Sequence, residues 1–324
     1  MRTLITCMGE CLIDFLPSKK AGQSNEFRMY PAGSILNVAV GVSRLGQPTA
    51  FACKLARDYF GRTLHNYIEQ NGIDTRYLST TEGHSTLAFV AMENGQASFD
   101  FYGDGTADTL MTMEDVPANL FNETKMLHIG SISLLRGTTP ETIKKTFQRL
   151  RGHALLSLDP NLRPHLVKDE AKYRALLQEL VSQTDLLKLS DADLDWLHPG
   201  ESITDALRQL AQQGPALVVI TRGDKGAIAL RKGGERPVHI PGFSVDIVDT
   251  IGAGDTFCAG LLTYLADQQI LTHADLAAIS DDKVTAMLRF AAASAALNCQ
   301  REGADPPKRS EVEAFLKAKD TQHA

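Results

Sequence analysis

The sequence predicts an α/β fold in which helices cover both faces of a mostly parallel sheet. Short apolar runs alternate with amphipathic helical patterns along most of the 324 residues, and this alternation is typical of βαβ units. Each run is followed by a polar turn, as parallel strands that alternate with helices require. We expect strands at 3–9, 124–130, 153–159, 185–190 and 216–221, with helices between them such as 170–182 and 202–213.

Two stretches, about 11–32 and 85–110, break this pattern. The second alternates apolar and polar residues around Asn94-Gly95, a pair that suits a hairpin turn. The first joins an extended segment to a polar loop. We expect both to form a small lid of antiparallel strands on a single domain that spans 1–324. Because lid strands have open edges, pairing with a second subunit would cover them, and we expect a homodimer through the lid.

Composition narrows the class of protein. Hydrophobic residues make up 43% and charged residues 22%, which is globular, and the net charge of −6 argues against a general nucleic-acid binder. No run of 18 apolar residues occurs, so no membrane span is predicted. Glu10 and Asp14 interrupt the apolar N-terminal segment, so we interpret it as a strand and not as a signal peptide. Five scattered cysteines without a C-x-x-C pair indicate reduced thiols and a cytoplasmic protein.

Unusual polar turns follow several of the predicted strands. The turns are "DPNLRP" at 159–164, "SDAD" at 190–193 and "TRGDKG" at 221–226, and the chain then reaches "DTIGAGD" at 249–255. Ligands of open α/β sheets bind at the carboxyl ends of the strands. We therefore expect these turns to border one crevice.

The stretch "DTIGAGDTFCAGLL" at 249–262 is the strongest single pattern. Gly252 and Gly254 can adopt positive φ and expose backbone N–H groups, and a helix that begins there favours an anion such as a phosphoryl group. Asp255 is itself an anion, which is explained if it takes a proton from an attacking hydroxyl. From the loop alone, a helix N-cap is an equal alternative. Phe257 stands where a dinucleotide fingerprint needs a third glycine, and no P-loop pattern occurs.

Three other patterns offer polar groups with two interpretations each. Asn37 lies one helical turn after Gly33, off the predicted buried stripe, so it could bond sugar hydroxyls or face solvent. Glu10 and Asp14, four residues apart in an extended segment, could both face one side and bind hydroxyls, or be exposed. Arg163 stands between two prolines and suits a phosphate. A structural salt bridge is the alternative for this arginine.

Taken together, these stretches resemble the ribokinase-like (PfkB) carbohydrate kinase family, and within it the fructokinase branch. The resemblance runs along nearly the whole chain. It rests on "GECLIDFLP", "AGSILNVAVGVSRLG", "DYFG", "DPNLR", "TRGDKGA" and above all "VDTIGAGDTFCAGLL". It implies a three-layer ribokinase-like sandwich with a β-sheet lid, and ATP-dependent phosphorylation of a sugar hydroxyl.

The resemblance also implies a role for each matching residue. The catalytic residues would be Asp255, which acts as the base, and Arg163, which lies beside the transferring phosphate. The backbone of Gly252, Ala253 and Gly254 would form an anion hole. The sugar would contact Glu10, Asp14, Gly33, Asn37, Phe101, Tyr102, Arg163 and Asp255. ATP would lie along Lys188, Ser190, Thr221, Gly223, Gly226, Gly254 and Asn298. Mg²⁺ would be held through water by Asp193, and K⁺ by the backbone at Asp249, Ile251 and Gly303.

The sequence departs from the family pattern at three places. Ala32-Gly33 replaces the usual pair of glycines, and Ser190 and Asp193 stand where the family has N-x-x-E, with Asp193 shorter than the usual glutamate. Gly103 follows Tyr102 where many fructokinases have a basic residue.

The substrate therefore stays open at this stage. D-fructose, converted to fructose 6-phosphate, is expected, with 2-keto-3-deoxygluconate, another ketose or a ribonucleoside as alternatives. A sugar-binding regulator and a nucleotide-cofactor oxidoreductase are the other classes. The lack of a Gly-rich turn after the first strand counts against the oxidoreductase.

Overall fold

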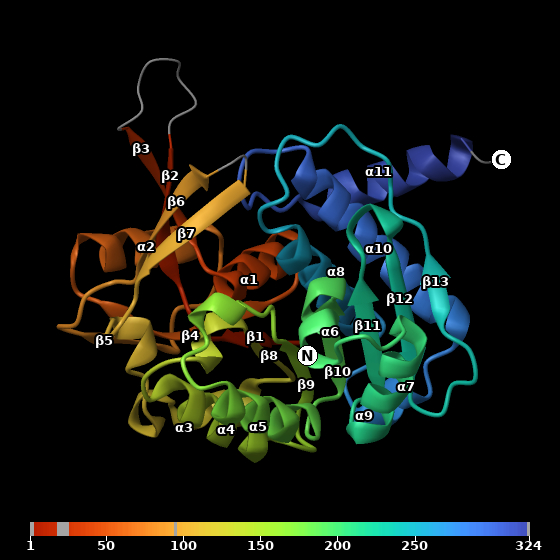
Figure 1. Cartoon of the computed structure of the whole chain (residues 1–324), viewed down its shortest axis with the longest axis horizontal. Helices are drawn as coiled ribbons and strands as arrows, with labels where there is room; N and C mark the ends of the chain where they lie inside the picture. Colours follow the sequence, from red (N-terminus) through yellow and green to blue (C-terminus); the bar gives the residue numbers. More distant parts are fainter. Residues whose placement is uncertain (1–2, 18–25, 94–95, 323–324) are drawn as a thin grey trace.

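A computed structural model describes residues 3–17, 26–93 and 96–322. Its main feature is a nine-stranded sheet in the order β13-β12-β11-β10-β9-β8-β1-β4-β5 (Figure 1). Neighbouring strands run parallel from β5 to β11, and β12 and β13 add an antiparallel edge. The strands are β1 (Ile5–Met8), β4 (Thr49–Ala56), β5 (Leu78–Thr81), β8 (Met126–Gly130), β9 (Leu155–Asp159), β10 (Leu186–Ser190), β11 (Leu217–Thr221), β12 (Ala227–Arg231) and β13 (Val238–Ile240).

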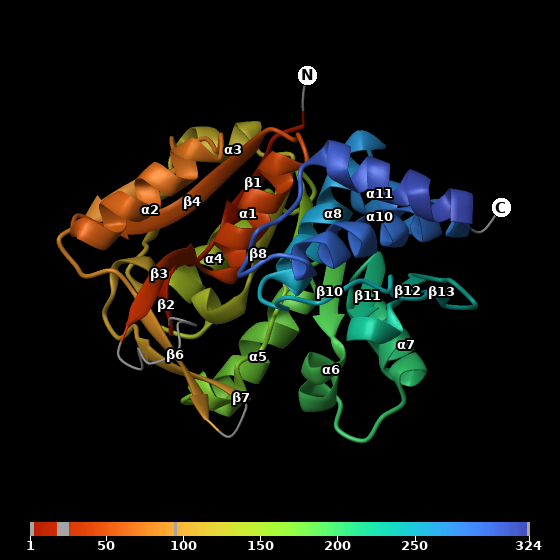
Figure 2. The same ribbon diagram turned by 90° about the horizontal axis from the view of Figure 1, so that it is seen from above.

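Helices cover both faces of this sheet, which explains why the central strands are buried and mostly apolar on both faces and not alternating. One layer holds α1 (Ser34–Arg44), α8 (Ala253–Asp267) and α10 (Asp281–Cys299), with α11 (Arg309–Gln322) outside it (Figures 1 and 2). The opposite layer holds α4 (Thr139–Leu150), α5 (Glu170–Val181) and α7 (Ile203–Gln213). Shorter or peripheral helices are α2 (Tyr59–Gln70), α3 (Ala118–Glu123), α6 (Asp191–Leu197) and α9 (His273–Ala277). The predicted fold class is confirmed, and the predicted strands and helices match to within two residues.

Small residues let the helices of the first layer approach closely. A Cβ on Gly41 of α1 would lie 2.7 Å from Ala259 of α8, and a Cβ on Gly260 would lie 2.6 Å from Ala291 of α10. Residues 35–42 of α1 are all buried, so the face away from the predicted stripe packs on α8. This packing brings the first turns of α1 and α8 together.

A second, four-stranded sheet stands at one end of the molecule in the order β3-β2-β6-β7. Its strands are β2 (Leu12–Pro17), β3 (Phe27–Ala32), β6 (Leu87–Glu93) and β7 (Gln96–Tyr102). One expectation is corrected, because β2 and β6 pair in parallel while the other pairs are antiparallel. Residues 103–110 leave this sheet and include a 3₁₀ turn, η1 (Ala107–Thr109), which packs on β4. The predicted turn at Asn94-Gly95 lies outside the described residues.

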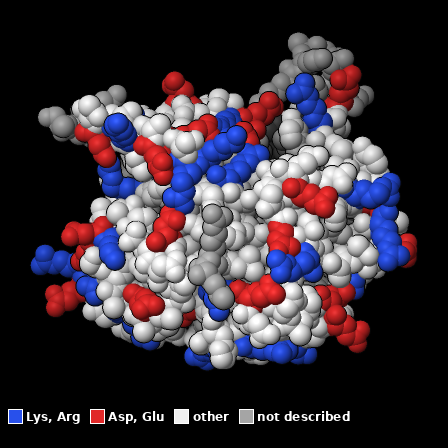
Figure 3. Space-filling model, turned by 180° about the vertical axis from the view of Figure 1, so that it is seen from behind, with Lys and Arg blue, Asp and Glu red and all other residues white. Residues whose placement is uncertain are grey.

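Acidic and basic side chains are interspersed on the face of the molecule that Figure 3 shows. Among the described helices, none is long and apolar enough to cross a bilayer.

Candidate active site

Two adjoining cavities lie at the carboxyl ends of the parallel strands, beside the start of α8. The polar cavity, of about 300 Å³, is lined by residues that include Glu10, Asp14, Asn37, Arg163 and Asp255. The apolar cavity, of about 440 Å³, is lined by residues that include Thr221, Phe243, Ile247, Phe257 and Ala296. Thr250 and Gly254 line both. Three of the four expected turns therefore border this crevice, while the turn at 190–193 lines neither cavity, and the loop before α8 separates the two halves.

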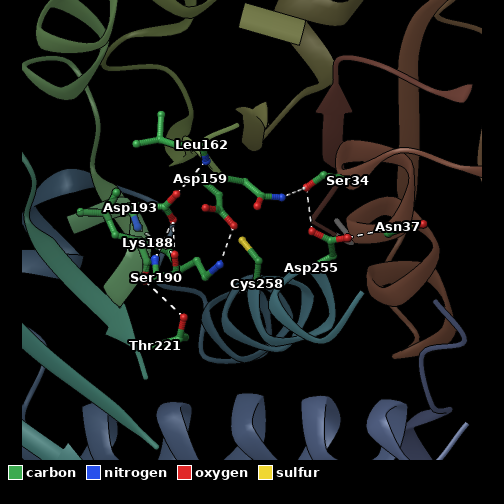
Figure 4. A network of polar contacts seen from close by, with 12 residues as sticks. Ser34, Asn37, Asp159, Leu162, Lys188, Ser190, Asp193, Thr221, Asp255 and Cys258 are labelled. Atoms are coloured by element: carbon green, nitrogen blue, oxygen red, sulfur yellow. Dashed lines mark hydrogen bonds and ion pairs between the residues drawn. The ribbon is translucent and has the colours of Figure 1, made fainter. Parts of the chain in front are cut away.

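Asp255 lies in the first turn of α8 and is held by the other helix of the pair. Its Oδ1 accepts a hydrogen bond from Ser34 Oγ at 2.7 Å, and its Oδ2 accepts one from Asn37 Nδ2 at 2.8 Å (Figure 4). The N-cap of α8 is Gly252, and no side chain caps the helix. Asp255 is therefore not the cap. The residue is 6% exposed and lines the polar cavity.

The loop before Asp255 differs in part from expectation. Gly252 has a φ of 73° in the left-handed region, as predicted, but Gly254 already belongs to the helix and has no positive φ. The Ala253 N–H donates to Thr250 O at 3.2 Å. The N–H groups of Gly254 and Asp255 have no carbonyl of their own helix to bond, since first-turn amides lack one. These two amides are thus available to an anion, whereas that of Ala253 is already used.

Two carboxyl groups besides Asp255 line the polar cavity. Glu10 is buried between two chain segments, with Oε1 accepting from Ile35 N at 3.4 Å and Oε2 from Ser133 N at 3.3 Å. Burial raises the pKa of Glu10 to about 7. Burial, and secondly the charge of Asp255, raise the pKa of Asp14 to about 7. Both residues face one side of their segment, as the sequence suggested.

Tyr102 does not lie in the polar cavity, which corrects the sequence-based assignment. Successive strand residues point to opposite faces, and Phe101 occupies the face that lines the cavity. Tyr102 is 64% exposed on the other face and stacks edge-on against Phe89 at 5.6 Å between ring centroids.

Arg163 enters the polar cavity on a rigid turn. Its Nη1 donates to Asn161 O at 3.0 Å, to Asn161 Oδ1 at 2.7 Å and to Leu162 O at 2.9 Å. Within the described residues no carboxylate pairs with this guanidinium, so it serves no structural salt bridge. Sequence reasoning missed Asn161 and Ser34 as partners of the site. The positive φ of Asn161, 41°, has no sequence signal beyond its place in "DPNLR".

A buried ion pair lies beneath the loop. Lys188 Nζ is 2.7 Å from Asp159 Oδ2, and both side chains are under 5% exposed. Lys188 does not line the apolar cavity; its Nζ is 3.2 Å from where a Cβ on Gly254 would be. Asp159 Oδ1 has no hydrogen-bond partner among the described residues. Burial raises the pKa of Asp159 to about 6, against the opposing charge of Lys188.

The carboxylate of Asp193 accepts hydrogen bonds from other residues of the protein. Its Oδ1 accepts from Leu162 N at 2.7 Å, and its Oδ2 accepts from Ser190 N and Ser190 Oγ, both at 2.7 Å. Ser190 and Asp193 thus form a capping box at the start of α6. The predicted contact of Asp193 with Mg²⁺ through water stays a prediction, because a carboxylate oxygen that accepts a hydrogen bond from the protein can accept another from water. Ser190 likewise does not line the apolar cavity.

The apolar cavity contains Thr221, Gly223 and Gly226, as the sequence suggested. Asn298 is not among its lining residues, because it is fully buried behind the loop. Its Nδ2 donates to Ile251 O at 2.8 Å, and its Oδ1 accepts from Thr256 Oγ1 at 3.3 Å. Other residues of α10 line the cavity instead: Ala292, Ala295, Ala296 and Cys299.

The three positions matched to a monovalent-cation site do lie together. Asp249 Oδ1 accepts from Ile251 N at 3.1 Å, and Asp249 Oδ2 accepts from Gly303 N at 3.0 Å. The carboxylate thereby joins the loop before α8 to the loop after α10, which leaves backbone carbonyls of these loops as the candidate ligands.

Comparisons with known proteins agree with this geometry. A model of the pfkB family of carbohydrate kinases matches residues 2–311. A fructokinase from Rhizobium leguminosarum bv. trifolii is 37% identical over 278 residues, which cover 86% of this chain and 84% of that protein.

Solved structures give the same result. A fructokinase with bound ATP from Xylella fastidiosa superposes with a TM-score of 0.91 at 29% identity, covering 99% of this chain and all of that one. A double mutant of fructokinase from Vibrio cholerae O395, with fructose, ADP and potassium ion bound, superposes at 0.86 with 26% identity, covering 97% and 98% of the two chains. The chain belongs to the pfkB family of carbohydrate kinases.

Proposed function

We propose that this kinase is a fructokinase that transfers the γ-phosphate of ATP to D-fructose and forms fructose 6-phosphate. One observation carries the proposal: Asp255 and Gly254 stand where a polar cavity and an apolar cavity meet. A sugar suits the first cavity and an adenine ring the second. The fructokinases similar to this chain support the choice of sugar.

The polar cavity suits a neutral sugar better than a sugar acid. Glu10, Asp14 and Asp255 place three carboxyl groups on its walls, against one cation, Arg163. Carboxyl oxygens accept hydrogen bonds from hydroxyl groups, whereas the carboxylate of 2-keto-3-deoxygluconate would meet the charge of Asp255 and, above about pH 7, also those of Glu10 and Asp14. Arg163 is the side chain that a phosphate also needs. This balance favours fructose over the sugar acid.

In the proposed reaction, Asp255 takes the proton of the sugar hydroxyl. The hydroxyl oxygen bonds to the γ-phosphorus, the bond from that phosphorus to the β-phosphate oxygen breaks, and ADP leaves. Negative charge on the transferring group is stabilised by the amides of Gly254 and Asp255 and by Arg163. On the nucleotide side, Thr221, Gly223 and Gly226 lie along ATP.

Metal ions complete the proposal. Mg²⁺ offsets the charge of the polyphosphate in such transfers. Asp193 would hold a water of its hydration shell, and Asp159 Oδ1, which has no hydrogen-bond partner among the described residues, would accept from another. The backbone at Asp249, Ile251 and Gly303 would hold K⁺, with the carbonyls of Ile251 and Gly303 also accepting hydrogen bonds from Asn298 Nδ2 and Asp305 N, and the ion would add positive charge beside the loop.

The four-stranded sheet is proposed to act as a lid and as a dimer surface. On its face away from the polar cavity, Phe15, Phe27, Phe89 and Tyr102 pack on one another and reach Phe60 of α2. Phe27 and Tyr102 are 45% and 64% exposed. A second copy of the chain would cover this aromatic face. The free cysteines support a reducing compartment such as the cytoplasm.

A coupled assay of ADP release tests the function directly. The purified chain is offered fructose, ribose, 2-keto-3-deoxygluconate and a nucleoside with ATP and Mg²⁺, with and without K⁺. Fructose should give the highest kcat/KM. A higher value for another sugar would reject fructose, and sugar binding without ADP release would reject the kinase in favour of a regulator. For the dimer, Tyr102→Asp should shift the sedimentation coefficient to that of a monomer.

A further inference from the structure

We propose that Ser34 is a positioning residue for the base, and that Oδ1 of Asp255 is the oxygen that receives the substrate proton. The inference rests on the proposed function and assigns a role that no sequence pattern indicates. It follows from a continuous chain of hydrogen bonds that crosses the polar cavity from Arg163 to Asp255.

Each link of this chain has a defined donor. Arg163 Nη1 donates to Asn161 Oδ1 at 2.7 Å, and Asn161 Nδ2 donates to Ser34 Oγ at 2.9 Å. Ser34 Oγ then donates to Asp255 Oδ1 at 2.7 Å. Because Ser34 accepts from the asparagine, its own proton is free to point at Asp255, and a dashed line joins the two side chains in Figure 4. The chain therefore connects the arginine on the phosphate side with the base on the sugar side.

This chain of hydrogen bonds also joins three structural elements that lie far apart in the sequence. Asn161 belongs to the turn after β9, Ser34 is the first residue of α1, and Asp255 is in the first turn of α8. Asn161 holds a positive φ of 41°, a conformation that asparagine tolerates better than most residues. Its backbone and side-chain oxygens both bind Arg163, which fixes the amide that reaches Ser34.

The two groups that donate hydrogen bonds to the carboxylate oxygens of Asp255 differ in how easily their donor protons can rotate. Oδ2 accepts from the amide of Asn37 at 2.8 Å, a planar group whose donors turn only with the whole side chain. Oδ1 accepts from the hydroxyl of Ser34, whose proton rotates about a single bond. When a sugar hydroxyl arrives, the Ser34 proton can turn away while Asn37 keeps the carboxylate in place. Oδ1 is thus the oxygen that can be released to accept a proton.

Loss of the Ser34 hydroxyl should therefore slow the chemical step more than it weakens sugar binding. Ser34→Ala leaves Asp255 Oδ1 and Asn161 Nδ2 without their partner, and the carboxylate gains freedom to turn. A hydrogen bond to a charged group corresponds to roughly tenfold or more in rate. We expect kcat to fall about tenfold or more, with the sugar KM changed less than about threefold.

The experiment measures kcat and sugar KM for the wild type, Ser34→Ala and Ser43→Ala. Ser43 is the matched control on the same helix, since its Oγ donates to Asn71 O away from the site. Thermal melting checks that each variant is folded. A Ser34→Ala variant with kcat within about twofold of wild type, or with the loss confined to KM, would overturn the proposal. A failure of the wild type to phosphorylate any sugar would instead reject the proposed function.

A double-mutant cycle with Asn161→Gly tests the connection itself. Glycine accepts the positive φ at this position and removes the amide that orients Ser34. If Asn161 orients Ser34 through their hydrogen bond, the Ser34→Ala substitution should lower kcat less than about threefold in the Asn161→Gly background. This loss is far smaller than the one expected in the wild type. An equal loss in both backgrounds would show that Asn161 does not orient Ser34, and would overturn the proposal.

Discussion

Asn37 and Asp255 are 218 positions apart in the chain, yet the Asn37 amide donates to Asp255 Oδ2 across 2.8 Å. The contact joins the first turns of α1 and α8, which approach because Gly41 and Ala259 leave no bulk between the helices. Sugar binding and proton transfer are therefore built on one helix pair, and a change at Asn37 should affect both.

Replacement of Asn37 by alanine should lower kcat/KM for the sugar by about tenfold to a hundredfold. The variant loses a hydroxyl partner in the polar cavity and one of the two donors that hold the base. Steady-state kinetics with fructose measures the loss. Asn119→Ala, an exposed substitution on α3, should behave as wild type. An Asn37→Ala enzyme with unchanged kcat/KM would contradict the placement of the sugar.

Replacement of Gly252 by alanine should destabilise the protein and abolish activity. The residue has a φ of 73°, and a Cβ would lie 2.6 Å from Ala304 Cβ. The left-handed conformation alone costs about 1–2 kcal/mol for alanine, and the clash adds to it. Gly200→Ala is the matched control, with a φ of 80° and nothing within 4 Å. Urea unfolding should show a clearly larger loss for Gly252→Ala, and equal losses would mean that the clash relaxes freely.

Replacement of Arg163 by lysine should fail to preserve turnover although it keeps the charge. The guanidinium is fixed by bonds to the carbonyls of Asn161 and Leu162, and a lysine ammonium cannot copy that planar geometry. We expect kcat to fall by about 10²-fold with little change in the sugar KM. Lys168→Arg, on the surface, serves as the control. An Arg163→Lys enzyme of normal kcat would show that a point charge is sufficient here.

Replacement of Asp14 by asparagine should stabilise the folded protein at alkaline pH. Burial raises the pKa of Asp14 from 3.8 to about 7, so between these values the folded chain binds a proton that the unfolded chain has released. The group therefore lowers the free energy of unfolding as pH rises through this window. Asp14→Asn should gain about 1 kcal/mol or more over wild type at pH 8 and nothing at pH 3.5. The same variant should show a higher sugar KM.

Urea unfolding at the two pH values checks this prediction. A stability difference between Asp14→Asn and wild type that does not depend on pH would contradict the shifted pKa. Asp191→Asn, at an exposed position at the start of α6, is the comparison for the loss of one surface carboxylate.

The sequence predicted the sheet and the loop before α8 well, because apolar runs and glycine spacing are local signals. The sequence does not show which face of β7 each residue occupies, so both Phe101 and Tyr102 are predicted at the sugar although only Phe101 lines the cavity. The hydrogen bonds of Asn298 and Asp193 to residues far along the chain are likewise not visible in the motifs that contain them. Ser34 could not be found from its own surroundings, since its partners come from two other elements.

The most direct test of the account is the turnover of Asp255→Asn with fructose and ATP. The amide keeps the shape of the side chain but cannot take a proton, so kcat should fall by at least about 10²-fold. Calorimetry should show that fructose and ATP still bind with near-normal affinity. A variant with near-normal kcat would contradict the central claim, because the proton would then leave the sugar without Asp255.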